Sequence, residues 1–382
     1  MTQFALAPPP ISRTQSVVTF LGMGTAAPAA MPQDQFTRHA AQINCQTAEQ
    51  HSWLHRVYQN SGVQSRGSVL FKGVHSHSDS LADFYPLSKG IDDRGPTTAQ
   101  RMVRYAVEAP LLASSAAMKA LADANTNASA ITHLITVSCT GFVAPGLDVT
   151  LVNQLRLLPS VRRLHIGFMG CHGAFNALAA ARDAVLANKN ARVLVCCVEL
   201  CSLHFAYGWD PGRLVANALF ADGAAAVVLG AKTGDIPASW ELHDTSSHLI
   251  PDSLDEMKWQ IGDHGFEMTL LPGVPKIIRR HLGAWCEEWL ARHDLQFSDI
   301  QYWAIHPGGP KILTAVAEAL SLPPAALEAS RDILSQHGNM SSATILFILQ
   351  KLAAQKAPGP CVAIGLGPGL MAEGMLLKPA TP

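Results

Sequence analysis

From residue 97 onward, short apolar runs alternate with longer amphipathic or alanine-rich segments, and this alternation restricts the possible folds more than any other feature. The short runs are rich in β-branched residues and bounded by Gly, Pro or polar residues, which is typical of buried strands. The pattern predicts strands over residues 132–137, 163–168, 191–198 and 224–229 and helices over 98–124, 149–157 and 173–187. Such alternation indicates an α/β fold with a largely parallel sheet covered by helices on both faces.

The same order of elements returns in the second half of the chain. The pattern predicts helices over residues 274–293, 310–319 and 342–355 and strands over 302–305, 361–364 and 373–377. We therefore expect two duplicated βαβαβ-type halves, residues 1–235 and 236–382, that meet near residues 232–237. The repetition is one of pattern and not of sequence identity.

Composition excludes several classes of protein. Of the 382 residues, 48% are hydrophobic and 15% charged, which predicts a large apolar core and excludes a disordered chain. The formal net charge is -1, so nothing indicates nucleic-acid binding. The longest apolar stretch, residues 193–205, is interrupted by Glu199 and is shorter than the roughly 20 residues that a membrane span needs. The first residues lack the pattern of a signal peptide. Because the eight cysteines lie mostly in strand-like runs, we expect reduced thiols and a cytoplasmic protein.

Cys171 stands in the segment MGCHGAF, between a predicted strand and an alanine-rich helix. This places the thiol at or beside a helix N-terminus, where unpaired N–H groups and the helix dipole favour the thiolate. A cysteine in such a place is a candidate nucleophile. A small core residue is the alternative interpretation, because isolated cysteines are usually buried for packing.

Two further segments place polar side chains at similar junctions between secondary-structure elements. His306 follows a predicted strand in AIHPGGP, and Asn339 precedes a helix in HGNMSS. Imidazole and amide N–H groups are the donors that stabilise the enolate oxygen of a thioester, although a core histidine and an N-cap asparagine are ordinary alternatives. A glycine-rich loop, GLGPGL, lacks the spacing of a dinucleotide fingerprint and is expected to line a cavity. His75 and His77 are expected to lie in a polar loop, since no further ligand completes a metal site.

Taken together, these segments resemble the type III polyketide synthases of the chalcone and stilbene synthase superfamily, within the thiolase fold. The resemblance covers roughly residues 16–377 in family order and is carried by the segments ITHLITVSCTGFVAPGLD, GFMGCHGAF, ARVLVCCVEL, ALFADGAAAVVLG, AIHPGGPKIL, HGNMSSATILFIL and AIGLGPGLMAE. It implies a thiolase-like fold with an α/β/α/β/α layered core. It also implies a homodimer whose interface lies near residues 143–153.

The resemblance also implies roles for individual residues. Cys171 corresponds to the nucleophile that carries the starter acyl group, and His306 and Asn339 to the pair that promotes malonyl-CoA decarboxylation. A further set corresponds to gate and cavity residues: Phe220 and Met268 at the gate, and Cys139, Cys201, His204, Gly367, Pro368 and Gly369 in the cavity wall. Cys139 replaces a threonine that is usual in plant members; packing as a small apolar side chain is the favoured interpretation, and tuning of cyclisation is the alternative. Ala144 replaces a methionine that reaches into the partner's cavity.

CoA binding is the least complete part of the resemblance. Arg56 corresponds to a basic residue that contacts CoA phosphates, but two neighbouring family lysines are Trp53 and Asn60 here. Lys311 or Arg66 is expected to compensate.

The resemblance predicts decarboxylative condensation of malonyl-CoA onto an acyl-CoA starter, with CoA thioesters as substrates and no metal or redox cofactor. Apolar replacements at Ala144 and Met268 favour a fatty acyl starter and alkylpyrone or alkylresorcinol products. The alternative is a malonyl-primed synthase of a polyhydroxylated aromatic, of the tetrahydroxynaphthalene or phloroglucinol type, which Cys139 favours. A ketoacyl-ACP synthase III shares the Cys, His and Asn set and remains a further alternative, as does a non-catalytic protein of the same fold.

Overall fold

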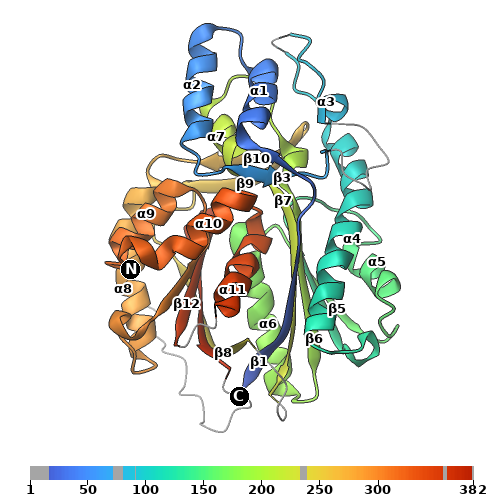
Figure 1. The fold of residues 1–382 in the computed structure, drawn as a ribbon, viewed down its shortest axis with the longest axis vertical. Coiled ribbons are helices and arrows are strands. Elements are labelled where there is room, and N and C mark those ends of the chain that lie inside the picture. Colours follow the sequence, from blue (N-terminus) through green and yellow to red (C-terminus); the bar gives the residue numbers. More distant parts are fainter. Residues whose placement is uncertain (1–16, 72–80, 91, 233–238, 356–358, 381–382) are drawn as a thin grey trace.

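The computed structural model describes residues 17–71, 81–90, 92–232, 239–355 and 359–380 (Figure 1). Its centre is a nine-stranded sheet with the order β11-β12-β13-β8-β1-β7-β6-β4-β5. The strands of this sheet are β1 Val18–Ala26, β4 His133–Ser138, β5 Arg162–Gly167, β6 Arg192–Leu200, β7 Asp222–Ala231, β8 Trp240–Leu249, β11 Tyr302–Ile305, β12 Cys361–Gly367 and β13 Met371–Pro379. Two small sheets pair β2 Ala30–Pro32 with β3 Ser65–Gly67, and β9 Met257–Gly262 with β10 Gly265–Leu270.

The helices agree with the alternating pattern of the sequence. Those predicted are α4 Thr98–Asp123, α5 Leu147–Gln154, α6 Gly173–Ala187, α8 Val274–Ala291, α9 Pro310–Ala319 and α11 Thr344–Ala354. The helix α2 Ala48–Gln59 begins with a capping box between Thr47 and Gln50. The other helices are α1 Gln33–Asn44, α3 Leu81–Phe84, α7 Pro211–Leu219 and α10 Glu328–His337.

The prediction of a largely parallel sheet is wrong. Only β4–β5, β4–β6 and β11–β12 are parallel among the described pairs of this sheet. The other neighbours, β1–β7, β1–β8, β6–β7, β8–β13 and β12–β13, are antiparallel. Two strands outside the alternating pattern account for much of the difference: β1 precedes it and is interrupted by glycines, and β8 is polar and half-exposed toward its end.

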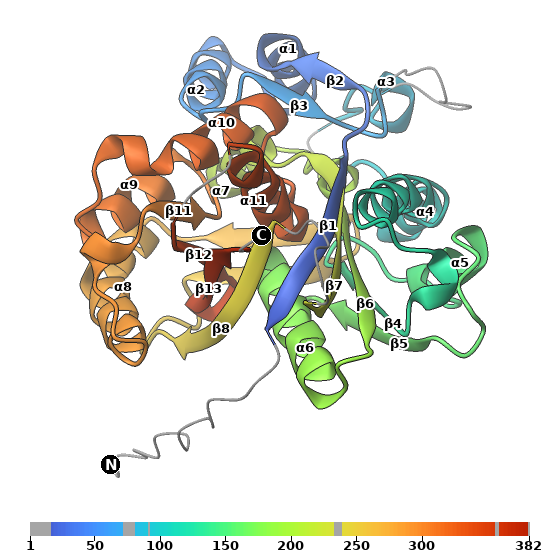
Figure 2. The same ribbon diagram turned by 60° about the horizontal axis from the view of Figure 1, so that its bottom comes forward.

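The sheet curves around two central helices, and this gives the fold its layers. Helix α6 contacts β4, β6 and β7 of one half and β8 and β13 of the other, and α11 contacts β1, β7 and β11. In Figure 2 both helices lie between the two arms of the sheet, with α4 and α5 outside one arm and α8 and α9 outside the other. Both central helices contribute to one fully buried apolar cluster. The predicted α/β/α/β/α layering therefore describes the arrangement.

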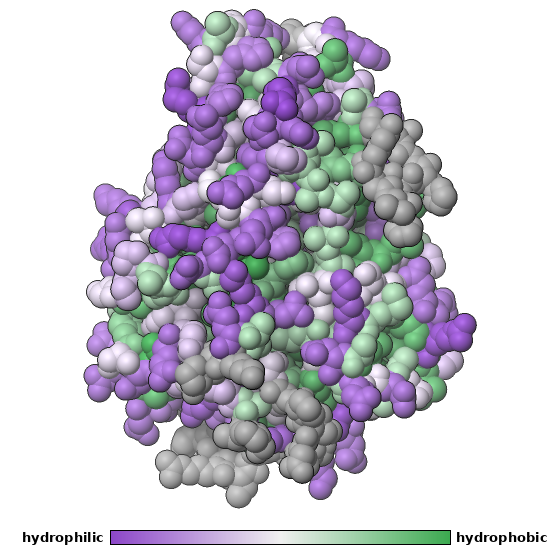
Figure 3. Space-filling view, viewed as in Figure 1, coloured by the Kyte–Doolittle hydropathy of each residue, from purple (hydrophilic) through white to green (hydrophobic). Residues whose placement is uncertain are grey.

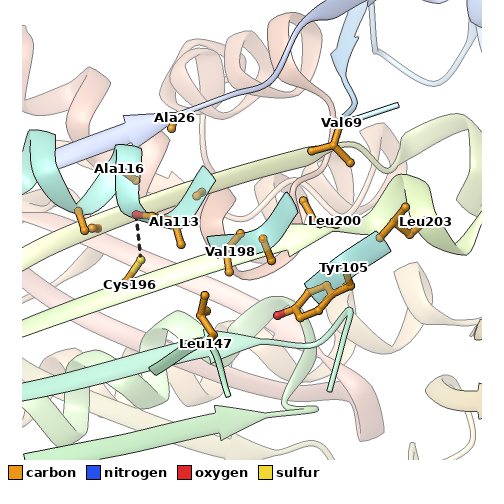
Figure 4. Packing of buried hydrophobic residues seen from close by; sticks show 14 of the residues in the cluster. Ala26, Val69, Tyr105, Ala113, Ala116, Leu147, Cys196, Val198, Leu200 and Leu203 are labelled. Atoms are coloured by element: carbon orange, nitrogen blue, oxygen red, sulfur yellow. Dashed lines mark hydrogen bonds between the residues drawn. The ribbon is translucent and has the colours of Figure 1, made fainter. Parts of the chain in front are cut away.

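Close packing of α4 on the first arm depends on two glycines of β1. A Cβ atom at Gly22 would lie 2.2 Å from the backbone nitrogen of Ala124, and one at Gly24 would lie 2.4 Å from the carbonyl oxygen of Ala116. Larger side chains there would push the helix away from the sheet. Figure 4 shows the resulting interior, in which Cys196 Sγ donates a hydrogen bond to the carbonyl of Ala113 at 3.6 Å.

The outer surface is mixed in polarity. Hydrophilic side chains dominate the region over α1 and α2 in the view of Figure 3, whereas apolar side chains are more frequent toward the middle of the same face. Within the described ranges, no helix is both long enough and apolar enough to cross a membrane.

Candidate active site

Three junctions between secondary-structure elements lie in the region where the two halves of the fold are in contact. Cys171 lies in a 3-10 turn, Gly170–His172, that leads directly into α6. His306 follows β11, and its N–H donates to the carbonyl of Ile364 in β12 at 2.9 Å. The turn of Cys171 contacts both β12 and the 3-10 turn Ser341–Ala343, which follows Asn339. The local placements expected for all three residues are therefore confirmed.

Asn339 is held by backbone bonds around the predicted gate residue Phe220. The N–H of Asn339 donates to the carbonyl of Leu219, and its own carbonyl accepts from Ala221, each at 2.9 Å. Its side-chain Oδ1 accepts from the N–H of Ser341, also at 2.9 Å. Because Oδ1 is engaged, the orientation of the amide is fixed and its NH₂ group is the end left to donate.

Burial dominates the ionisation of the thiol and the imidazole. Burial raises the pKa of Cys171 to about 12, against smaller lowering effects of hydrogen bonds from Ser341 and Asn339. Burial lowers the pKa of His306 to about 3, and the charge of His172 adds to this effect. The structure thus favours a neutral thiol and a neutral imidazole, whereas the helix terminus alone had suggested a thiolate.

Both ring nitrogens of His306 lack a hydrogen-bond partner among the described residues, although the side chain is 3% exposed. Buried polar atoms are nearly always paired, so two unpaired nitrogens on one ring are unusual. An imidazole in this condition has a donor and an acceptor available for a bound molecule.

A buried carboxylate beside the site was not identified from the sequence. Glu199 accepts hydrogen bonds from the N–H of Cys139 at 2.9 Å, from Thr140 Oγ1 at 2.8 Å and from Ser342 Oγ. Burial raises its pKa to about 7. The available signal was a single charged residue inside an otherwise apolar strand, because burial of an ionisable group needs several hydrogen bonds.

Cys139 and the glycine-rich loop both pack against the turn of Cys171. The N–H of Gly170 donates to Cys139 Sγ at 2.9 Å, so a second sulfur lies next to this turn. On the other side, a Cβ atom at Gly170 would lie 2.3 Å from Cδ of Pro368, and one at Gly367 would lie 2.2 Å from Cδ2 of His172. The loop continues through Gly369, which has a φ of 74°. Pro368 and Gly367 therefore pack against the turn of Cys171, and neither residue lines the neighbouring cavity.

A cavity of about 300 Å³ lies beside this centre. Four of the predicted gate and cavity residues line it, namely Phe220, Met268, Cys201 and His204. Cys171, His306, Asn339, Cys139 and the loop residues Gly367 to Gly369 are not part of its lining. Since Phe220 lines the cavity and pairs with Asn339 through an isolated β-bridge, it lies between the cavity and the three junctions.

His204 joins three parts of the cavity wall. Its Nε2–H donates to the carbonyl of Thr140 at 2.8 Å, and its Nδ1 accepts from the N–H of Phe266 at 2.9 Å. The imidazole also stacks on the Phe266 ring, with centroids 4.1 Å apart. Trp259 Nε1 donates to the carbonyl of Cys139 at 2.8 Å. The β9–β10 hairpin that carries Met268 is thereby attached to the turn after β4.

The two residues predicted to bind CoA do not line the cavity. Arg56 on α2 and Lys311 at the start of α9 are exposed side chains outside it, and the arginines that do line it are Arg66, Arg94 and Arg213. Arg66 is buried and donates to the carbonyls of Asn217, Ala218 and Phe220 and to Gln33. It therefore supports the wall, and its groups are committed to protein acceptors.

No group of three or more His, Cys, Asp or Glu side chains is arranged to hold a metal ion in the part of the chain that the structure describes. His75 and His77 lie outside the described residues.

Comparison with known proteins agrees with this geometry. The family model for chalcone and stilbene synthases, N-terminal domain, matches residues 11–233, and the model for their C-terminal domain matches residues 241–381. A 1,3,6,8-tetrahydroxynaphthalene synthase of Streptomyces peucetius subsp. caesius is 34% identical over 94% of both chains. An alpha-pyrone synthesis polyketide synthase-like protein, Pks18, of Mycobacterium tuberculosis is 32% identical, over 97% of this chain and 93% of Pks18.

Solved structures agree as well. PKS-I from the brown alga Ectocarpus siliculosus superposes with a TM-score of 0.89 at 30% identity, covering 97% of this chain and all of that one. The C-terminal type III polyketide synthase domain of Steely1 from Dictyostelium gives a TM-score of 0.85 at 26% identity, covering 96% of this chain and all of that domain.

The architecture is therefore the thiolase fold of enzymes that transfer acyl groups to build polyketides. Within that class, the chain belongs to the chalcone and stilbene synthase family and is a type III polyketide synthase. The predicted fold class, enzyme class and family are confirmed.

Proposed function

We propose that Cys171 is the nucleophile that accepts the starter acyl group. The observation that carries the proposal is the pair of unpartnered nitrogens on the buried His306 ring, which is near enough to His172, the residue after Cys171, for that residue's charge to affect its pKa. The Cys171 thiol in turn has a hydrogen bond with the side chain of Asn339. The Sγ atom attacks the thioester carbonyl of acyl-CoA while His306 takes the thiol proton. CoA leaves as its thiolate and receives that proton, so a neutral site is restored.

Malonyl-CoA then binds with its thioester oxygen toward the N–H of His306 and the NH₂ of Asn339. The C–C bond to the carboxylate breaks, CO₂ leaves, and its electron pair forms an enolate held by the two donors. The enolate carbon attacks the acyl carbonyl on Cys171, whose sulfur departs. Return of the lengthened chain to Cys171 starts another round.

For the substrate, we propose a fatty acyl starter and alkylpyrone or alkylresorcinol products. The flexible side chain of Met268 at the cavity supports this, as does similarity to a protein named for alpha-pyrone synthesis. A malonyl-primed aromatic product is the second candidate. It is supported by the Cys139 sulfur beside the Gly170 backbone and by similarity to a tetrahydroxynaphthalene synthase.

The test is incubation of the purified protein with labelled malonyl-CoA and starters from acetyl-CoA to long-chain acyl-CoA, followed by mass spectrometry. A ladder of alkylated products supports the first candidate, and product from malonyl-CoA alone supports the second. Cys171→Ala is expected to abolish condensation and to retain some malonyl-CoA decarboxylation. Cys45→Ala, in a half-buried cysteine at the end of α1, is the matched control. Normal product from Cys171→Ala would refute the role of the thiol.

We also propose that the protein is a homodimer. Phe142 and Val143 are each 43% exposed, Leu164 is 46% exposed, and β5 is the terminal strand of the sheet. Exposed apolar side chains beside an unpaired strand edge favour association. Leu164→Glu should shift the sedimentation coefficient to that of a monomer, and an unchanged coefficient would contradict this interface.

Two broader proposals concern the whole chain. The eight cysteines are all free thiols, which supports a reducing, cytoplasmic location. We further propose that the halves 1–235 and 236–382 are structural repeats that fold together, because β1 of the first pairs with β8 of the second.

A further inference from the structure

Two tryptophans on the surface form an aromatic pair. Trp53 on α2 and Trp209, two residues before α7, meet with ring centroids 5.2 Å apart and an interplanar angle of 66°. Trp209 is 38% exposed and Trp53 is half-buried. The edge-to-face contact fixes both rings, while more than a third of Trp209 remains open to solvent. Trp53 also stands where the family resemblance places a lysine that contacts CoA, so a cation has been replaced by an aromatic ring.

The pair borders the cavity beside the catalytic centre. Trp209 lies between Tyr207 and Arg213, which both line that cavity. Helices α2 and α7 contact each other and lie side by side in Figure 1. Arg94, another lining residue, lies close as well, because its Nη1 is 3.4 Å from the Cβ that a side chain at Gly208 would have.

Two arginines lie on the helices that carry or follow the aromatic pair. Arg56 lies three residues after Trp53 and therefore on the same side of α2. Arg213 lies on α7 and is held by Glu267, with Nη2 and Oε2 2.7 Å apart. A partly exposed indole with arginines on the neighbouring segments is suited to a purine nucleotide, since an indole ring stacks on a base and guanidinium groups bind phosphates.

We propose that Trp209, braced by Trp53, is the stacking platform for the adenine of the CoA thioesters, with Arg94 and Arg213 near the phosphates. The proposal rests on the proposed function, in which CoA thioesters are the substrates. Stacking replaces part of the charge attraction that lysines would supply at Trp53 and Asn60. It depends little on ionic strength, whereas phosphate contacts weaken as salt rises.

The experiment compares malonyl-CoA with malonyl-pantetheine, which carries the same reacting group without the nucleotide. Alanine substitution at a base-stacking aromatic residue costs about 5- to 150-fold in affinity. We expect Trp209→Ala to lower kcat/KM for malonyl-CoA at least about fivefold, mainly through KM, and to lower the preference for the CoA ester by the same factor. Trp209→Phe retains a stacking ring and should recover most of the preference. Val103→Ala, at a position 70% exposed on α4, is the matched control.

Two results would overturn the platform. One is an equal loss with both thioesters, and the other is a Trp209→Phe variant as impaired as Trp209→Ala. A marked preference of the wild type for a malonyl carrier protein over malonyl-CoA would also overturn it, because a carrier presents no adenine. Failure of the proposed function can be distinguished from failure of the stacking platform. In the former case the wild type would convert neither malonyl-CoA nor malonyl-pantetheine with any starter.

Discussion

Replacing His204 with glutamine tests how the cavity wall is held together. Burial lowers the pKa of His204 to about 3 from 6.5, with the two bonds to Thr140 and Phe266 formed by the neutral ring. Between these two pKa values the unfolded chain binds a proton at this site and the native protein does not. Stability therefore falls as the pH falls, with a slope that approaches about 1.4 kcal/mol per unit, and the total loss between pH 6.5 and 4.5 is about 2 kcal/mol.

Glutamine cannot titrate and retains one donor and one acceptor, but it loses the ring stacked on Phe266. We therefore expect His204→Gln to be less stable than the wild type by about 1 kcal/mol at pH 7, where the imidazole is neutral in both states. The order of stability should reverse between roughly pH 5 and 6, and the variant should be more stable than the wild type by roughly 1–2 kcal/mol at pH 4.5. Contributions from other titrating groups, such as His306, are common to both proteins and cancel in the difference.

Urea denaturation of both proteins from pH 4.5 to 8 measures this difference. Phe266→Leu is the control, because it removes the stacking partner without changing a titratable group, so its curve should run parallel to that of the wild type. Parallel curves for wild type and His204→Gln would refute the reasoning, because they would mean that the native imidazole accepts protons as readily as the unfolded chain.

Three further predictions concern the catalytic turn and its surroundings. Because burial raises the pKa of Cys171 to about 12, its alkylation by iodoacetamide should accelerate about tenfold per unit between pH 7 and 10, and a fast, pH-independent rate would instead reveal a stable thiolate. Gly367→Ala would place a Cβ 2.2 Å from His172, so we expect a loss of about 1–3 kcal/mol and of condensation activity, whereas Gly212→Ala, with its nearest contact at 3.4 Å, should leave the unfolding midpoint unchanged. Burial raises the pKa of Glu199 from 4.5 to about 7, so native protonation makes wild-type stability fall as the pH rises across that range, and Glu199→Gln should gain stability relative to the wild type from pH 5 to 7 in denaturation experiments.

The elements that carry the chemistry were predictable because each produces a strong local pattern. The strand β11 before His306 and the helix α11 after Asn339 are apolar and mostly buried. The strand β5 before Cys171 was expected to be buried as well, but it is an edge strand that is exposed over most of its length. A side chain at such a junction is placed by the backbone, so its position follows from the elements on either side. For this reason the junctions between these elements lie where they were expected. The relative direction of several neighbouring strands was predicted wrongly.

The cavity wall could not be predicted in the same way. The β9–β10 hairpin is short and half-exposed, and its hydrogen bonds with Cys139 and His204 join residues more than 60 positions apart. Likewise, the hydrogen bonds of Glu199 come from two different turns, which no local pattern connects. Contacts of this kind depend on the tertiary arrangement, and sequence patterns identify the residues without identifying their partners.

Phe220, the proposed gate, and Asn339, the proposed catalytic amide, share backbone bonds, and this limits how the enzyme can vary. Asn339 is bonded to Leu219 and Ala221 on both sides of Phe220, so a backbone shift at the gate would also displace the amide. Among the described residues, no hydrogen bond joins the β9–β10 hairpin to Asn339, and the hairpin is attached instead to His204, Cys139, Thr98 and Arg213. Changes of side chain on the hairpin can therefore alter the cavity while the crossing of the two halves stays fixed.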